Sequence, residues 1–294
     1  NEWKPGTPLA TVNEGAGGPP VTVPPSLLDA IERGLALGEV TDGAFDITWA
    51  ALWGLWDFRA VSPAVPDAAE IDRRRALIDY RRVVVDREKF TVSLPQAGMK
   101  IGLGGIAKGW ALDRAAALLR ARGITSFLIS AGGQVYAAGD KDGEPWRVGI
   151  RDPRGAADSY YTVVEVRDAS VSTSGDYERF FQIDGVRYHH ILDPRTGRPA
   201  QGAWSATVIA PRATDADALS TALMILGPER GLGMNLYRPI GADDDVLHLK
   251  LFHRGSPVPL SDVMPMLENM GVRVLSEVPF EMAARDGTDG VWIH

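Results

Sequence analysis

The sequence predicts an α+β fold, in which helices and short strands mix within one main domain. Segments with apolar residues at helical spacing alternate along the chain with short strand-like runs. Glycine and proline turns separate these segments at short intervals. The chain has 294 residues, of which 45% are hydrophobic and 23% charged, so it can bury a substantial core.

The elements can be placed in order along the chain. Residues 1–25 are rich in Pro and Gly and are expected to form an extended loop. Ser26 is expected to cap a helix that runs to about Leu37, because leucines and isoleucines recur there at helical spacing. Later helices are predicted over 68–82, 106–122 and 213–226, and strands over 83–94 (a pair), 126–139, 145–151, 159–167 and 205–211.

Composition excludes several classes of function. A net charge of −7 argues against nucleic-acid binding, which relies on a cationic surface. No stretch approaches the roughly 18 apolar residues of a membrane-spanning helix. The chain contains no cysteine, which rules out disulfides, thiolate catalysis and cysteine-ligated metals.

The stretch 44–58 combines an acid with three tryptophans. Trp49, Trp53 and Trp56 recur at helical intervals, which favours core packing over a ligand platform. Asp46 lies within an apolar segment, and a buried acid needs a partner.

The segment 172–200 carries most of the reactive side chains. It is predicted to hold a small-residue turn, an aromatic hairpin, a His pair and an Asp-Pro-x-Thr-Gly turn, at 172–175, 176–188, 189–190 and 193–197. The two histidines are candidates for acid–base chemistry. The alternative for each is a structural histidine hydrogen-bonded to Asp193, which we favour for His189 and not for His190.

Three further patterns are typical of a ligand site but also have structural explanations. Glycines at 102, 104 and 105 precede a predicted helix, where backbone amides can approach a phosphate, although such turns are also plain connections. Gly132 and Gly133 interrupt a predicted strand, which suggests a bulge or close contact with a ligand. Asp217 and Thr221 are one helical turn apart and share a face, either as a polar site or as a helix-dipole acid beside an ordinary hydroxyl.

Five motifs together resemble one family. They are DGAFDIT with LWGLW, LGGIAKGWALDRAA, SAGG, STSGDYERFF followed by RYHHILDPRTGRPA, and ATDADALSTALMILG. They occur in the order seen in the ApbE flavin transferases, the FAD:protein FMN transferases, and the match covers about residues 1–234. The resemblance implies a mixed α/β fold, binding of FAD and Mg²⁺, and transfer of FMN from FAD to a threonine of a target flavoprotein, with release of AMP.

The resemblance also implies roles for individual residues. The metal would be held by the Asp217 carboxylate, the Thr221 hydroxyl and the Gly105 carbonyl, which are hard oxygen ligands of the kind Mg²⁺ prefers. His190 would help to deprotonate the attacking threonine. The residues expected to bind FAD are Trp3, Ala44, Phe45, Asp46, Lys108 and Ile191. Because many relatives are periplasmic lipoproteins, we expect a periplasmic or membrane-anchored protein, with the cytoplasm as the alternative.

The chain also departs from the family pattern. Gly102 stands where an acid expected to contact FAD is usual, and Ser130 and Gln134 replace an Asn and an Asp. The strand and Met-Gly-Thr motif that usually precede Trp3 are absent, so we expect an N-terminally truncated domain. The alternative function is therefore a protein that holds FAD without transferring FMN.

Residues 235–294 resemble a different protein, the regulatory portion of large NAD-dependent glutamate dehydrogenases. A β-α-β-β unit similar to ACT modules is expected, with a strand at 246–253, a helix at 260–271 and strands at 272–279 and 290–293. No nicotinamide-binding fingerprint is present, so we predict no dehydrogenase activity. A third hypothesis is a fusion whose tail binds a regulatory amino acid or a partner.

Overall fold

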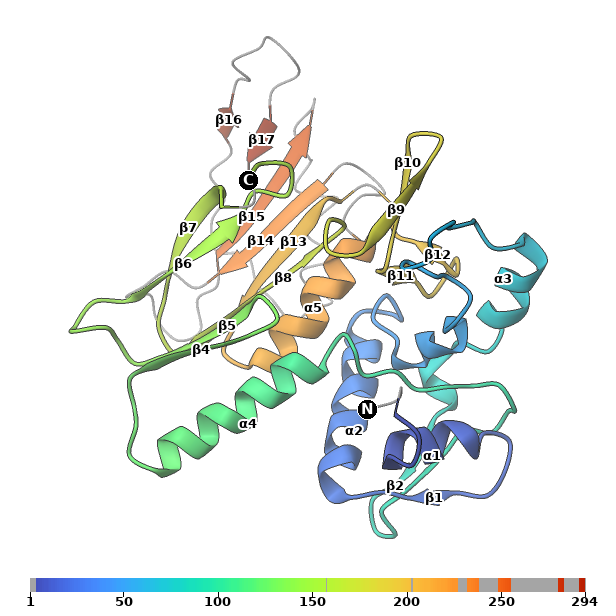
Figure 1. Cartoon of the computed structure of the whole chain (residues 1–294). Coiled ribbons are helices and arrows are strands. Elements are labelled where there is room, and N and C mark those ends of the chain that lie inside the picture. The colour runs from blue at the N-terminus through green and yellow to red at the C-terminus, as the bar shows by residue number, and fades with distance from the viewer. Residues whose placement is uncertain are drawn as a thin grey trace.

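The computed structural model describes most of the chain in full. The described residues are 4–156, 158–201 and 203–226, together with the backbone of the strands at 232–237, 248–254, 280–282 and 291–293. Helices and sheets are both present, which confirms the mixed α+β class (Figure 1). The helices are α1 (Pro8–Glu14), α2 (Pro25–Val40), α3 (Ala68–Arg75), α4 (Ala107–Ala121) and α5 (Ala213–Leu226), with 3₁₀ helices at Ile47–Leu52 and Tyr80–Arg82.

A four-stranded antiparallel sheet forms the centre of the molecule. Its strand order is β13 (Ser205–Ala210), β8 (Ala169–Gly175), β5 (Gln134–Ala138) and β4 (Phe127–Ala131). Helix α5 packs on β8 and β13, whereas α4 packs on β4 and β5 (Figure 1). The two helices also pack on each other, so both lie against the same sheet.

Smaller sheets surround this centre. Strands β1 (Val21–Thr22), β2 (Val84–Asp86) and β3 (Thr91–Ser93) form one sheet near the N-terminal helices. The antiparallel pairs are β6 (Trp146–Arg151) with β7 (Tyr160–Val166), β9 (Phe180–Ile183) with β10 (Val186–His189), and β11 (Leu192–Asp193) with β12 (Arg198–Pro199). These confirm the predicted strand pairs at 83–94 and 145–167 and the hairpin at 176–188.

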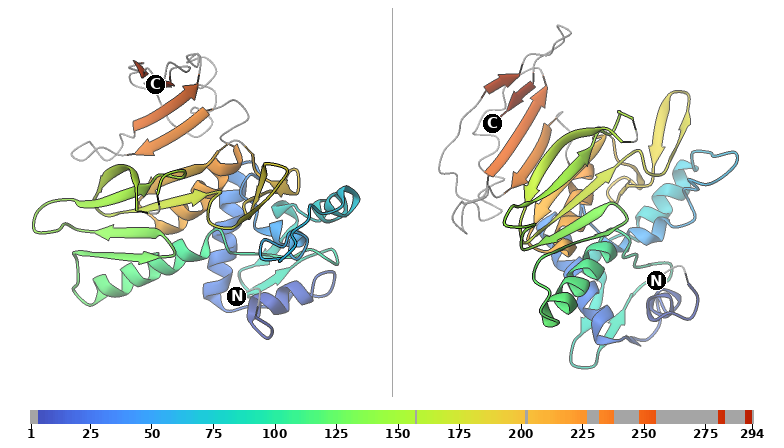
Figure 2. Two further views of the ribbon diagram at one scale, coloured as in Figure 1. Left: turned by 45° about the horizontal axis from the view of Figure 1, so that its top comes forward. Right: turned by 60° about the vertical axis from the view of Figure 1, so that its left-hand side comes forward.

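The C-terminal strands form a second four-stranded antiparallel sheet, whose strand β14 (Leu232–Tyr237) lies next to β13 of the central sheet (Figure 1 and Figure 2). Its order is β14, β15 (His248–Arg254), β17 (Val291–Ile293) and β16 (Phe280–Met282). β15 and β17 agree with the strands expected at 246–253 and 290–293. The helix expected at 260–271 and the strand expected at 272–279 lie outside the described residues, and the domain boundary at 234 stays a prediction.

Near the N-terminus the structure corrects the sequence analysis. Residues 8–14 form a helix instead of a loop, because Thr7 accepts a hydrogen bond from the Ala10 amide and Pro8 occupies the first turn. Helix α2 begins one residue before Ser26, without a side-chain cap. The helix predicted over 68–82 ends at Arg75. Trp53 is 48% exposed, so the prediction that it belongs to the core is wrong.

Two corrections concern the central sheet. The predicted strand 126–139 is a hairpin of β4 and β5, in which Gly132 and Gly133 both have positive φ, of 53° and 85°. Two-residue hairpin loops require this conformation and glycine adopts it readily. The segment Ser172–Gly175, predicted as a turn, is the second half of β8 and pairs with β13.

Helices α4 and α5 touch at Gly109. A Cβ atom built on Gly109 would lie 2.1 Å from the Ala213 carbonyl oxygen and 2.7 Å from the Thr214 Cα. Only a glycine therefore permits this approach of the two helices. Among the described residues, none of the helices has both the length and the apolar character needed to cross a bilayer.

Gly109→Ala is predicted to destabilise the protein by about 1–3 kcal/mol, because the added methyl group forces the two helices apart. Helix propensity alone would give the opposite sign, since Ala is favoured over Gly by about 1 kcal/mol. Urea unfolding measures the difference. The matched control is Ala111→Gly at an exposed position of α4, which should cost only the propensity term. A Gly109→Ala variant as stable as the parent protein would contradict the packing argument.

Candidate functional site

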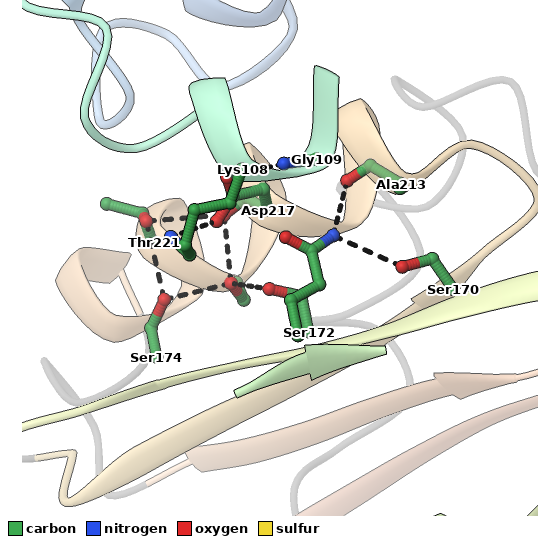
Figure 3. A network of polar contacts seen from close by, with 10 residues as sticks. Lys108, Gly109, Ser170, Ser172, Ser174, Ala213, Asp217 and Thr221 are labelled. Carbon is green, nitrogen blue, oxygen red and sulfur yellow. Dashed lines mark hydrogen bonds and ion pairs between the residues drawn. The ribbon is translucent and has the colours of Figure 1, made fainter. Parts of the chain in front are cut away.

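Asp217 is the charged centre of the site. It lies on α5 with its side chain only 2% exposed. Its Oδ1 accepts a hydrogen bond from the Lys108 ammonium at 2.8 Å, and its Oδ2 accepts one from the Gly109 amide at 3.1 Å (Figure 3). A buried carboxylate requires such partners, because its desolvation is otherwise very costly. The α4–α5 contact therefore positions both the acid and its counter-ion.

Thr221 lies one turn after Asp217 on α5, and Gly105 lies close to Thr221. The Thr221 hydroxyl is 3.3 Å from the Asp217 carbonyl oxygen, one helical turn earlier. A Cβ atom on Gly105 would lie 3.5 Å from Thr221 Oγ1 and 3.0 Å from the ring of Phe45. The structure thus brings together all three residues for which a metal role was predicted.

This donor set fits a divalent cation such as Mg²⁺. A carboxylate, a hydroxyl and a close stretch of backbone offer hard oxygen atoms. A side chain at Gly105 would fill the space beside the Thr221 hydroxyl. The Lys108 ammonium already sits as a cation on Asp217 Oδ1, which indicates that the carboxylate is placed to hold positive charge. No cluster of three or more His, Cys, Asp or Glu side chains occurs among the described residues, so this site rests on a different set of donors.

The predicted FAD-binding residues differ in their exposure, because some are buried, Lys108 is partly exposed and Trp3 is not among the described residues. Phe45 is buried with its ring next to Gly105, and Ala44 is buried beside it in the chain. The Lys108 side chain is 41% exposed, so its ammonium remains open to a ligand. Ile191 is buried, and its carbonyl accepts a hydrogen bond from the Ala200 amide. Trp3 lies outside the described residues.

Asp46 has a structural partner for each oxygen. Its Oδ1 accepts hydrogen bonds from the amide and the hydroxyl of Thr48, at 2.7 and 2.6 Å, and its Oδ2 accepts one from the Tyr80 amide at 2.9 Å. Burial raises the pKa of Asp46, and these hydrogen bonds act in the opposite direction. The partners that the sequence analysis required for this acid are Thr48, through its amide and hydroxyl, and the amide of Tyr80 from a distant part of the chain. A contact of Asp46 with FAD stays a prediction.

The two adjacent histidines differ in their contacts. His189 donates from Nε2 to the Ala200 carbonyl at 2.7 Å and accepts at Nδ1 from the Ile191 amide at 3.3 Å. It is therefore a structural residue, with a partner other than the expected Asp193. The Asp193 carboxylate is bound by the Arg195 guanidinium instead.

His190 keeps an unused ring nitrogen. Its Nδ1 is buried and has no hydrogen-bond partner among the described residues. Burial lowers the pKa of His190 to about 4, and the charges of Arg179 and Lys108 act in the same direction. In the Nε2–H tautomer the neutral ring offers Nδ1 as a proton acceptor.

The sequence analysis missed a row of hydroxyl groups on β8. Ser172 and Ser174 point to the same face because strand residues alternate, and both contact Ser220 of α5, at 3.3 and 2.8 Å. The intervening Thr173 points the other way and contacts Thr207 of β13. The spacing of two positions between Ser172 and Ser174 could have indicated a strand with both hydroxyl groups on one face. The prediction of a turn at this segment led us to miss it.

Two of the residues that depart from the family pattern, Gly102 and Gln134, are fixed by their packing and hydrogen bonds. A Cβ atom on Gly102 would lie 2.9 Å from the Ala50 Cβ and 3.0 Å from the Trp49 Nε1. The Trp49 indole donates to the Gly102 carbonyl at 3.1 Å, so it fills the place that an acidic side chain would need. Gln134 is buried and donates to the Ala213 carbonyl and the Ser170 hydroxyl, while its Oε1 has no partner among the described residues.

The lowered pKa of His190 predicts a pH dependence of stability. In the unfolded chain His190 takes up a proton below about pH 6.5, whereas in the folded protein it does so only near pH 4. Between pH 6.5 and 4 the unfolded state therefore gains a proton that the folded state does not. The free energy of unfolding falls over this range by about 3 kcal/mol at most, and above pH 6.5 His190 has no such effect. Urea unfolding of the parent protein and of His190→Gln between pH 7.5 and 4.5 measures this. The variant should lose less stability, and two parallel curves would contradict the assignment.

Comparison with known proteins gives two family matches. The model of the ApbE family matches residues 1–239, and that of the glutamate dehydrogenase ACT3 domain matches residues 231–294. Relatives named FAD:protein FMN transferase occur in Treponema pallidum and Vibrio cholerae. The first is 44% identical over 241 residues, covering 77% of this chain and 67% of the relative. The second is 34% identical over 230 residues, covering 77% and 68%.

Solved structures agree with these matches. The ApbE protein from Thermotoga maritima has 41% sequence identity and a TM-score of 0.72, over 77% of this chain and 73% of its own. The flavinyl transferase ApbE from Pseudomonas stutzeri, in its apo form, has 33% identity and a TM-score of 0.71, over 87% and 78%. The similarity therefore covers the whole region in which the site lies.

Proposed function

The chain belongs to the ApbE family and is an enzyme of the FAD:protein FMN transferase class, and we propose that it transfers FMN to a threonine hydroxyl in a Mg²⁺-dependent reaction that releases AMP. In this reaction the threonine oxygen forms a bond to the phosphorus of the FMN half of FAD. The bond from that phosphorus to the bridging diphosphate oxygen breaks, and AMP leaves with the bridging oxygen. The observation that carries the proposal is the buried Asp217 carboxylate, held between Lys108 and the Gly109 amide beside Thr221.

The metal would be held by Asp217, Thr221 and the backbone of Gly105. When bound, Mg²⁺ supplies positive charge to diphosphate oxygens and stabilises the charge that develops during phosphoryl transfer. Lys108 is the second source of charge. Its exposed ammonium can contact a diphosphate oxygen, because a metal on Asp217 takes over the neutralisation that Lys108 provides in the metal-free protein.

His190 is proposed to accept the proton of the attacking threonine at Nδ1. Its lowered pKa keeps the imidazole neutral at physiological pH, so Nδ1 can accept a proton once a threonine hydroxyl reaches this buried nitrogen. A base with a pKa of about 4 is weak, but the approach of the diphosphate, with charge opposite to that of imidazolium, would raise the pKa. The same negative charge would offset the effects of Lys108 and Arg179.

The protein partner is proposed to be a flavoprotein subunit that presents a threonine to this site. The support is the family membership, together with the buried Asp217 carboxylate that is paired with Lys108. We further propose that the reaction takes place in the periplasm or at its membrane, and this rests on the motif resemblance alone. The match of residues 231–294 to an ACT3 domain supports a regulatory tail as an additional hypothesis.

Asp217→Ala is predicted to lower FMN transfer by at least about 10³-fold, because it removes the only negative charge proposed to hold the metal. The assay follows covalent flavin fluorescence on a threonine-bearing target peptide and the release of AMP from FAD. The matched control is Asp215→Asn, an acid on the same helix that is paired with Arg33. This control should retain activity within a few-fold. Full activity of Asp217→Ala would contradict the metal assignment, and bound FAD without AMP release in the parent protein would favour the storage alternative.

The pH dependence of transfer tests His190 directly. The value of kcat/KM for FAD reports the free enzyme, so it should rise with pH through about 4 and be level near neutrality. The value of kcat reports the FAD complex and should show a higher apparent pKa, because the diphosphate charge favours the imidazolium. His190→Gln should remove both of these transitions and lower kcat by roughly 10²–10⁴-fold. Unchanged pH profiles in this variant would assign the proton transfer to another group.

A further inference from the structure

We propose that the Ser174 hydroxyl oxygen is a further ligand of the divalent cation held by Asp217 and Thr221. This inference rests on the proposed function, because it concerns the same metal. Ser174 lies on β8, across from α5, and reaches toward Thr221 (Figure 3). Its Oγ is 3.3 Å from Thr221 Oγ1 and 2.8 Å from Ser220 Oγ.

The hydrogen bonds of this row allow one arrangement of protons that leaves lone pairs facing Thr221. Ser220 is fully buried, and its hydroxyl is 2.9 Å from the Asp217 carbonyl oxygen, which can only accept. When Ser220 donates to this carbonyl, the 2.8 Å contact between Ser220 and Ser174 uses the proton of Ser174. In that arrangement Ser174 presents only lone pairs to its other neighbour, Thr221.

Thr221 also has a lone pair to offer. Its proton can go to the Asp217 carbonyl or to Ser174, both at 3.3 Å. A cation on the Thr221 oxygen favours the first choice, because the proton then points away from the positive charge. Two hydroxyl oxygens, one from the helix and one from the strand, would then face each other with lone pairs alone. Such a contact is repulsive unless a cation lies between them.

The separation of these oxygens agrees with a shared metal. Neighbouring ligands of an octahedral ion with bonds of about 2.1 Å are about 3.0 Å apart, and longer bonds to Ca²⁺ widen this distance. The observed 3.3 Å therefore requires a movement of only a few tenths of an ångström. The central sheet would thus hold the metal together with α5, which links the ion to two elements that pack on each other.

The absence of cysteine from the sequence allows a sharp test. Ser174→Cys replaces a hard oxygen with a soft sulfur, so it should weaken Mg²⁺ binding about 10-fold or more and strengthen Cd²⁺ binding. Titration calorimetry of the flavin-free protein with Mg²⁺ and Cd²⁺ measures both affinities. The ultraviolet charge-transfer absorption of a Cd²⁺–thiolate bond reports contact with the introduced sulfur. The matched control is Ser172→Cys, because Ser172 lies on the same face of β8 and contacts Ser220 but is not in contact with Thr221 in any described hydrogen bond.

The outcomes separate this inference from the proposed function. The inference is supported if Ser174→Cys gives the absorption band and the change of metal preference, and Ser172→Cys gives neither. It is overturned if both cysteine variants bind Mg²⁺ like the parent protein while Asp217→Ala abolishes binding, since the metal site then exists without Ser174. If the parent protein itself binds no divalent ion, the metal in the proposed function fails and the inference fails with it. Ser174→Ala, with a retained unfolding midpoint, should reproduce the loss of Mg²⁺ affinity without the gain for Cd²⁺.

Discussion

The close approach of α4 and α5 at Gly109 is the constraint on which the site depends. Because Gly109 has no side chain, the Ala213 carbonyl and the Thr214 backbone of α5 can lie directly against α4. This contact brings the Asp217 carboxylate to the Gly109 amide and to the ammonium of Lys108, the residue directly before Gly109 in α4. A bulkier residue would move the carboxylate away from both partners, so the electrostatics of the site follow from a packing requirement.

The site is organised around exchangeable positive charge. The buried Asp217 carboxylate is stable only next to a cation, and in this structure the cation is a lysine whose side chain is partly exposed. In the proposed function, a metal ion on Asp217 would release this flexible ammonium to contact a phosphate. The same positive surroundings help to keep His190 neutral, so the site without ligand lacks negative charge beyond Asp217 among the groups that contact it.

Polar groups outside the charged pair complete this arrangement. Ser172 and Ser174 of β8 are hydrogen-bonded to Ser220, whose hydroxyl also contacts the Asp217 carbonyl, so the row of hydroxyl groups is tied to α5. On the opposite side, the Trp49 indole occupies the space next to Gly102 and bonds its carbonyl. The Trp49 ring therefore occupies the space that an acidic side chain at position 102 would need. A glycine is required there by the packing.

The sequence by itself determined the mixed fold class, the extent of helix α5 and the motif residues of the site. Helical spacing and glycine stops are local signals, and they placed 213–226 correctly because the same residues satisfy both propensity and packing. Local signals failed where pairing with distant segments decided the outcome. Ser172–Gly175 became a strand because β13 supplies hydrogen-bond partners. The turn at Gly132-Gly133 is a different case, because it joins two strands that are neighbours in the sequence, and the signal missed there was the turn chemistry of the glycine pair. Only the tertiary structure could show that Lys108 holds Asp217 and that Ser174 faces Thr221. The first pair is separated by 109 positions in the chain and the second pair by 47.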